Sequence, residues 1–270
     1  MPVVAQDGRK LWQRRTRGES LTRWALWFAL VLLIAICWRF IDGQTVWEFV
    51  YDAPYQTMDL VQRSWPPDVA YLGALARPVW DTLNIATLGT LLAVVLAAPI
   101  AFLAARNTTP SRMLRAGALL AIVSSRSINS LVWGLVLVSV FGPGVLAGIL
   151  AIALRSIGFV AKLLYEAIEE IDPAPVEAIE STGARRLQVL GFGIVPQVLP
   201  AFAGISVFRW DINIREATVL GLVGAGGIGI QLEAAKDSLD WQRVAIILLL
   251  ILGLVVISEA VSARLRKAAS

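Results

Sequence analysis

The sequence predicts an all-α integral membrane protein with six transmembrane helices. Of its 270 residues, 57% are hydrophobic and only 16% are charged, and the mean hydropathy is +0.69. These values do not fit a chain that must stay soluble. Six stretches approach the roughly 20 apolar residues that a helix needs to cross the hydrocarbon core. They are residues 24–41, 83–105, 116–141, 145–165, 198–222 and 244–261.

The distribution of positive charge predicts that both termini lie in the cytoplasm, because short loops rich in Lys and Arg remain on that side. Such residues precede the first span, follow the sixth and occupy two alternate loops. They are Arg9, Lys10, Arg14, Arg15, Arg17, Arg23, Arg106, Arg112, Arg115, Arg185, Arg186, Arg264, Arg266 and Lys267. A cleaved signal peptide is a poor alternative for the start, since the first apolar run ends in Trp38, Arg39 and Phe40 rather than in small residues.

The first outer loop, residues 42–81, is long for a connector and mixes aromatic with acidic side chains. The aromatic residues are Trp47, Phe49, Tyr51, Tyr55 and Trp65. Because aromatic rings prefer the membrane interface, we expect an amphipathic segment lying there. A docking surface for another protein is the alternative, and the two are compatible.

Residues 166–196, between the fourth and fifth spans, are too charged to cross a membrane and too long for a simple turn. Asp172 followed by Pro173 predicts a helix start, Gly183 predicts its end, and residues 184–190 can form a second short helix. Such a projection could serve as a lever that transmits mechanical work to the spans. An ordinary, well-capped cytoplasmic loop is the alternative.

The fifth span contains four charged residues, and a charge near mid-bilayer costs about 2.5–3.5 kcal/mol on insertion scales. In a regular helix Arg209, Asn213 and Glu216 share one face, while Asp211 and Arg215 share nearly the opposite one. Because both faces are polar, we expect this helix inside an assembly rather than against lipid. The spacing of Asp211 and Arg215 favours a structural ion pair.

Arg126 and Arg155 also fall near mid-membrane. Four arginines and two carboxylates therefore lie within the spans, an excess of two positive charges. Surplus guanidinium suits an oxyanion, because its planar fork matches phosphate or phosphonate geometry. The alternative for Arg126 or Arg155 is that it snorkels or binds helix-end carbonyls.

A glycine-rich run follows the fifth span, in which Gly224, Gly226 and Gly229 spell GxGxxG. We reject a dinucleotide site, because no strand precedes the run and no βαβ unit surrounds it. Together with Gly227, these glycines would allow tight backbone packing or a hinge where a path opens and shuts.

The composition leaves little material for catalysis. There are no histidines, and the single cysteine, Cys37, excludes an intrachain disulfide. We therefore expect no catalytic residue, no metal site and no enzyme activity in this chain, and GK followed by Ser or Thr, the mark of a P-loop, is absent. A net charge of +4 is too small to indicate nucleic-acid binding.

Glu177-Ala178, then Gly183 and Pro196, resemble the EAA signature of ABC importer membrane subunits, whose coupling helices fit into a cleft of the ATPase subunit. Ile179 stands where a second alanine is usual, and Gly193 and Val195 replace Ile and Leu. The resemblance implies that the ATPase contacts a set of five residues. They are Glu177, Ala178, Gly183, Ala184 and Arg185.

Residues 209–229 strongly resemble the phosphonate-importer membrane subunit, as do residues 183–188 and 195–200. The similarity runs from about Val79 to Val261. One departure is Asn129, where relatives often carry proline, so a different kink is expected in the third span. Methionine importers share the glycine run and the EAA region.

This resemblance implies a type I ABC-importer permease fold, with coupling helices at about 166–196, in the plasma membrane of a bacterium. The regions would be an N-terminal part (1–78), a permease core (79–262) and a cytoplasmic tail (263–270). A homodimer would work in the lipid bilayer with a cytoplasmic ATPase dimer, which uses ATP and Mg²⁺, and with an extracytoplasmic substrate-binding protein. The chain itself would bind no cofactor.

The implied cargo is phosphonate or a related oxyanion such as phosphate or phosphite, guided by Arg209, Asn213, Arg215 and Arg126. An importer for another solute such as methionine is the first alternative. A lipid-handling enzyme and a proton-coupled transporter are more distant ones, since the sequence shows neither clustered acid–base residues at an interface nor an inverted repeat.

Overall fold

The computed structural model of the protein describes residues 3–6, 9–12 and 17–269. They fall into two compact units, Met1–Asp59 and Leu60–Ser270. This division lies nearer the N-terminus than the predicted boundary between residues 78 and 79, and the functional regions proposed from the sequence stay a prediction.

The first unit contains β1 (Val3–Gln6), β2 (Arg9–Trp12), α1 (Arg17–Gln44) and the start of α2 (Trp47–Ser64). The two strands pair in antiparallel fashion, a small departure from the all-α expectation. With 28 residues, α1 is about 42 Å long at 1.5 Å per residue, which is enough to cross a bilayer. It contains the first predicted span and exposes its apolar side chains, as a helix surrounded by lipid does.

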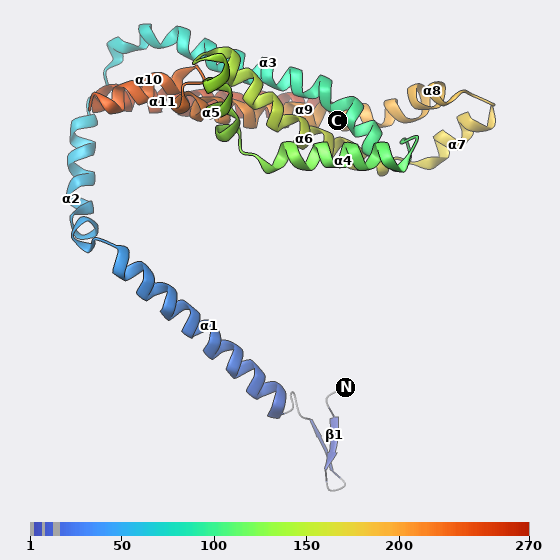
Figure 1. Ribbon diagram of the computed structural model, residues 1–270, viewed down its shortest axis with the longest axis horizontal. Helices are drawn as coiled ribbons and strands as arrows, with labels where there is room; N and C mark the ends of the chain where they lie inside the picture. Colours follow the sequence, from blue (N-terminus) through green and yellow to red (C-terminus); the bar gives the residue numbers. More distant parts are fainter. Residues whose placement is uncertain (1–2, 7–8, 13–16, 270) are drawn as a thin grey trace. The chain divides into compact units, whose positions relative to one another are not determined.

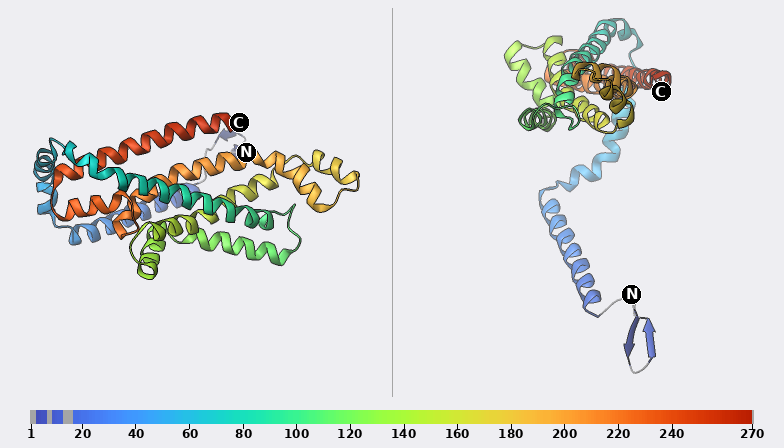
Figure 2. Two further views of the ribbon diagram at one scale, coloured as in Figure 1. Left: turned by 90° about the horizontal axis from the view of Figure 1, so that it is seen from above. Right: turned by 90° about the vertical axis from the view of Figure 1, so that its right-hand side faces the viewer.

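The second unit is a bundle of long helices (Figures 1 and 2). Its elements in chain order are η1 (Val69–Tyr71), α3 (Leu72–Ala104), α4 (Arg112–Ser127), α5 (Ser130–Phe141), α6 (Val145–Glu169), α7 (Pro173–Ser181), α8 (Arg186–Val189), η2 (Leu190–Ile194), α9 (Val195–Leu220), η3 (Gly221–Val223), α10 (Ile228–Asp237) and α11 (Trp241–Ala269). The central helix is α6, which packs against α3, α4, α5 and α9. On the other side of α9 lies α11.

Small residues allow α6 to lie close to its neighbours. A Cβ atom on Gly89 of α3 would come within 2.8 Å of the Ile152 side chain, and one on Gly158 of α6 within 2.6 Å of the Ile122 carbonyl oxygen. Membrane helices use small residues in this way, because association in lipid depends on close packing rather than on the hydrophobic effect. The tight packing of α3, α6 and α9 holds the polar residues described below in place.

Five helical segments of the described residues are long and apolar enough to cross a membrane, and a sixth results if α4 and α5 count together. The predicted third span over residues 116–141 is a bent pair, because α4 and α5 meet at 88°, at the place where the sequence predicts a kink. The backbone is extended at Ile128 and Asn129, and the Asn129 side chain caps α5 by accepting a hydrogen bond from the Leu131 N–H. Hydropathy alone does not report such a bend.

The projection between α6 and α9 follows the predicted signals at its start. Asp172 caps α7 by accepting a hydrogen bond from the Ala174 N–H at 3.0 Å, and Gly183 has a φ of +78° just beyond the helix. The second short helix predicted over 184–190 is present as α8, but it begins only at Arg186 and does not end as a separate helix, since it continues through the π-helical turn η2 into α9. Arg185 is extended, and its N–H donates to the Gln188 side chain.

Candidate functional site

Within the bundle, α9 directs Arg209, Asn213 and Glu216 toward α6 and α3, as the helical spacing predicts. Arg209 is only 2% exposed, and its Nη2 lies 3.3 Å from Oε1 of Glu216. Arg155 of α6 donates to the same carboxylate oxygen. Two guanidinium groups from different helices therefore share one carboxylate.

Neutral polar groups hold this charged cluster in place. Arg209 Nε donates to the Ser156 hydroxyl at 2.9 Å, and Ser156 donates to Oδ1 of Asn213 at 3.1 Å. Asn213 Nδ2 in turn donates to Thr90 of α3 at 2.7 Å. The Arg209 guanidinium also lies 5.0 Å from the ring centre of Phe159. Because a buried charge is costly unless it is paired and hydrogen-bonded, this network is what allows Arg209 to occupy the bundle.

The second charged pair of α9 lies on a different face. Arg215 donates to Oδ2 of Asp211, so the predicted i,i+4 ion pair forms. Asp211 is buried and also accepts a hydrogen bond of 2.8 Å from Ser258 of α11. This pair attaches α9 to α11, whereas the Arg209 cluster attaches it to α6 and α3.

A cavity of about 280 Å³ lies where α5 begins, between α6 and α9. Its lining residues are Asn129, Ser130, Leu131, Arg155, Ile212, Arg215, Glu216 and Val219. Arg155 and Arg215 thus meet at one cavity although they come from different helices. Arg155 and Arg215 against Glu216 leave one positive charge in excess on its wall.

Of the four residues predicted to guide an anion, the structure brings Arg209 and Asn213 together and places Arg215 on the adjoining cavity wall. Arg126 is exposed in the last turn of α4 and is absent from that wall. Because Arg126 does not line the cavity, the predicted surplus of two positive charges is reduced to one. Sequence reasoning omitted Arg155 from the set, and it missed Ser156 and Thr90, whose small polar side chains carry no signal until the helices are packed.

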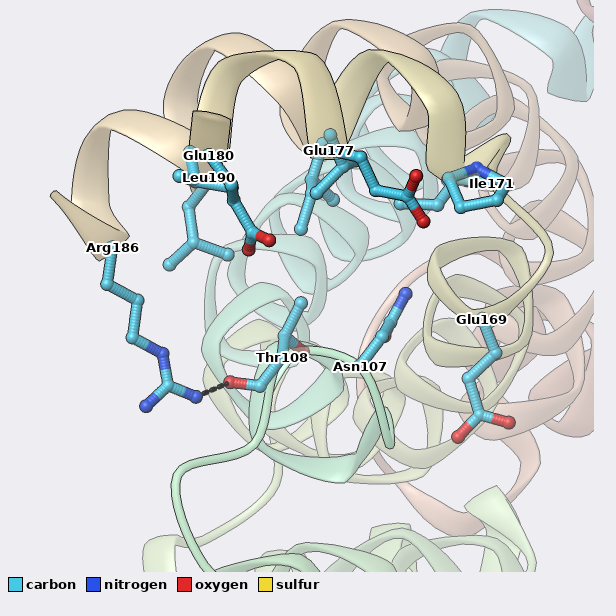
Figure 3. Close-up of a pocket in the computed structure, with 12 residues that line it drawn as sticks. Asn107, Thr108, Glu169, Ile171, Glu177, Glu180, Arg186 and Leu190 are labelled. Carbon is cyan, nitrogen blue, oxygen red and sulfur yellow. Dashed lines mark hydrogen bonds between the residues drawn. The ribbon is translucent and has the colours of Figure 1, made fainter. Parts of the chain in front are cut away.

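The projection between α6 and α9 encloses a second cavity, of about 530 Å³, which is drawn in Figure 3. Glu177 and Glu180 reach into it from α7, and Asn107 and Thr108 line it from the loop between α3 and α4. Arg186 of α8 crosses the opening and donates to the Thr108 carbonyl oxygen at 2.9 Å.

Further hydrogen bonds attach the projection to the bundle. Asn107 Nδ2 donates to the Ile168 carbonyl oxygen at 2.6 Å, and the Asp172 N–H donates to Gln197 of α9 at 3.1 Å. The projection is thereby braced against the α3–α4 loop and against α9. Of the predicted coupling residues, Glu177 and Ala178 are exposed on α7, with Glu177 at the cavity, and Gly183, Ala184 and Arg185 lie in the turn before α8.

The glycine-rich run packs tightly rather than forming an open loop. Gly224, Gly226 and Gly227 have φ values of +82°, +90° and +76°, which side chains rarely adopt. The Ile228 N–H donates to the Thr82 hydroxyl at 2.8 Å. A Cβ atom on Gly229 would lie 2.2 Å from the Thr218 carbonyl oxygen. The sequence suggested tight backbone packing or a hinge for these glycines. The structure shows the tight packing, and the hinge role stays a prediction.

Among the described residues, no three His, Cys, Asp or Glu side chains gather as ligands for a metal ion. Arg155 and Arg215 instead place hydrogen-bond donors on the wall of the 280 Å³ cavity. Such donors can hold an anion reversibly.

The chain is similar to membrane components of transport systems. A family described as "Binding-protein-dependent transport system inner membrane component" matches residues 97–270. The chain is 39% identical to the phosphite transport system permease protein PtxC of Stutzerimonas stutzeri, over 93% of this chain and 92% of that protein. It is 43% identical to the phosphate-import permease protein PhnE of Mycolicibacterium smegmatis, over 75% of this chain and 39% of that one.

Among solved structures, the inward-facing MetNI methionine ABC transporter matches with a TM-score of 0.65 and 21% identity, covering 75% of this chain and 99% of that one. At this identity the likeness speaks for the fold alone. The architecture is that of a type I ABC-importer permease, as the sequence resemblance implies.

Proposed function

Because the chain belongs to the family of binding-protein-dependent transport system inner membrane components, we propose that it is the permease subunit of an ATP-driven importer of phosphite, phosphonate or phosphate. The observation that carries this proposal is the 39% identity to a phosphite permease, which extends over nearly the full length of both chains. The cavity lined by Arg155 and Arg215 supports it, since guanidinium groups bind phosphorus oxyanions well. The chain is a multi-pass protein of the inner membrane.

Permeases of this family work with a separate ATPase and a substrate-binding protein. Two copies of this chain form the pathway, and an ATPase dimer supplies the energy, with ATP and Mg²⁺ bound by that partner. The absence of a P-loop sequence supports this division of labour. Closure of the ATPase dimer moves α7 and the turn through Gly183, Ala184 and Arg185, and the brace to the α3–α4 loop and α9 carries the movement into the spans.

Arg209, Asn213 and Arg215 line the pathway together with Arg155, while Arg126 attracts the anion from the exposed end of α4. Gly224, Gly226, Gly227 and Gly229 act as the hinge when the path opens. Methionine import is the competing function, and it rests on weaker similarity. One methionine permease, from Vibrio cholerae, is 27% identical over 44% of this chain.

The test uses the whole complex in proteoliposomes, with its binding protein, and measures uptake of phosphite, phosphate, methylphosphonate and methionine together with ATP hydrolysis. We expect uptake of a phosphorus oxyanion and none of methionine. Glu177→Ala should assemble normally but lose the stimulation of ATP hydrolysis by loaded binding protein, whereas Glu259→Ala, an exposed carboxylate on α11, should keep it. Transport of methionine alone would refute the proposed cargo, and normal stimulation in Glu177→Ala would refute the lever.

A further inference from the structure

Glu216 occupies a position that an incoming oxyanion would need. Its Oε1 accepts from Arg155, and Arg209 Nη2 lies 3.3 Å from Oε1 and 3.4 Å from Oε2. A carboxylate and a phosphorus oxyanion offer an arginine the same kind of acceptor, namely two oxygens that fit its fork. The two therefore compete for the same guanidinium groups.

Arg209 has partners other than Glu216. Ser156 accepts from its Nε at 2.9 Å, and the Phe159 ring lies beneath its guanidinium group at 5.0 Å. Its side chain is 3% exposed. An arginine held so firmly stays in place when its carboxylate partner moves away, so it forms a standing anion site.

The Arg155–Glu216 contact lies at the wall of the 280 Å³ cavity, where a solute can reach it. The Arg155 side chain is 31% exposed and that of Glu216 is 15% exposed. Arg215 lines the same cavity and is itself neutralised by Asp211. Among the described residues that line the cavity, Glu216 is the carboxylate that also contacts the buried Arg209.

We propose that Glu216 is an internal counter-ion: it occupies Arg155 and Arg209 in the empty pathway and is displaced by the transported oxyanion. This inference rests on the proposed function, and it assigns to Glu216 the role of lowering the affinity of the pathway for the transported oxyanion. Two guanidinium groups left without an anion in the membrane would repel each other, which explains why the empty state needs a carboxylate. Competition also keeps the anion weakly bound, as transport requires. The apparent affinity for the anion decreases when fewer arginine sites are free of the carboxylate.

The test measures equilibrium binding of radiolabelled inorganic phosphate, with unlabelled phosphite as competitor, to the whole complex in nanodiscs without binding protein and nucleotide. We expect Glu216→Gln to bind phosphate about tenfold more tightly than the wild type, because the counter-ion no longer competes. The double variant Glu216→Gln/Arg155→Gln should lose this gain. Glu233→Gln changes a half-buried carboxylate of α10 that pairs with Lys236; this variant should equal the wild type and reports phosphate held by the ATPase subunits.

Glu216→Asp is a second variant that tests the proposal if Glu216→Gln fails to fold. A side chain one methylene shorter keeps the charge but cannot reach both arginines, so it should also bind phosphate more tightly than the wild type. Binding equal to the wild type in both variants, or a gain that survives loss of Arg155, would overturn the proposal. Phosphite uptake by wild-type proteoliposomes is measured in parallel. Uptake together with unchanged phosphate binding in Glu216→Gln would refute the counter-ion role alone. Tighter phosphate binding in Glu216→Gln without any uptake would refute the proposed import function alone.

Discussion

Gly229 lies where the start of α10 touches the end of α9, backbone against backbone. A Cβ atom there would be 2.2 Å from the Thr218 carbonyl oxygen and 2.7 Å from the Gly221 Cα. Because both atoms belong to the backbone, they cannot move aside as a flexible side chain would. We expect Gly229→Ala to destabilise the protein by about 1–3 kcal/mol, the usual range for overpacking.

Gly253→Ala is the matched control for this prediction. Gly253 lies inside α11 with no atom near the position that its Cβ would take, and alanine stabilises a helix interior by about 0.5–1 kcal/mol relative to glycine. The measurement is the fraction of detergent-solubilised complex that stays monodisperse after heating. Equal survival of the two variants would show that the α9–α10 contact yields easily, and the hinge role would then gain support over rigid packing.

At the same scale, the sequence predicted which residues of α9 share a face but not what they meet. The positions of Arg209, Asn213 and Glu216 follow from helical geometry within one element. Their partners Ser156 and Thr90 lie on α6 and α3, and their identity depends on how closely those helices pack. Arg155 was visible as a charge near mid-membrane, yet its choice of Glu216 as partner required the tertiary structure.

Among the elements, the bent pair α4–α5 depends on a residue whose backbone already suits proline. Asn129 has φ −70° and ψ 149°, and Ile128 before it is extended at φ −100° and ψ 130°. Proline fixes φ near −65° and favours an extended preceding residue. We therefore expect Asn129→Pro to keep the bend and to lose only the side-chain cap on Leu131, at a cost of about 1 kcal/mol.

Ser139→Pro tests the same substitution inside α5, where the ring removes a helical hydrogen bond and clashes with the preceding turn, at a cost of about 3 kcal/mol or more. Both variants are compared by yield of folded complex and by survival on heating. If Asn129→Pro were as damaging as Ser139→Pro, the extended geometry at residues 128–129 would not describe the folded protein in the membrane.

Helix boundaries show the same contrast between local and tertiary signals. The start of α7 was predictable because Asp172 and Pro173 act on the next turn of backbone, and Gly183 acts just beyond its end. The junction of α8 with α9 was not, since the π-helical turn at Leu190–Ile194 lets one helix continue where the sequence shows two glycines among apolar residues. Apolar content likewise predicted enough hydrophobic length over residues 116–141, but a bent pair and a straight helix have the same hydropathy.

For the whole molecule, the apolar runs and the loop charges predict the number of spans and their orientation, because these properties are set by the bilayer rather than by packing. Work with an ATPase and a substrate-binding protein follows from family membership and not from the fold of one chain, and assembly with a second copy of the chain stays a proposal. The orientation of the termini has a direct consequence that labelling can measure. It concerns Ser181 and Ser238, which are both exposed and lie on either side of the Arg186–Val223 span.

If that segment crosses the membrane once, the two serines must face opposite compartments. The only cysteine, Cys37, is first replaced by serine, so that each new thiol is unique. In this background we expect Ser181→Cys to react with a membrane-impermeant maleimide only in inverted vesicles, and Ser238→Cys only in intact spheroplasts, because the arginine-rich loops place α7 in the cytoplasm. Serine and cysteine are nearly equal in size, so neither change should disturb the fold. Reaction of both thiols from one side would mean that α9 does not cross the bilayer, and a reversed pattern would place α7 beyond the reach of any cytoplasmic ATPase.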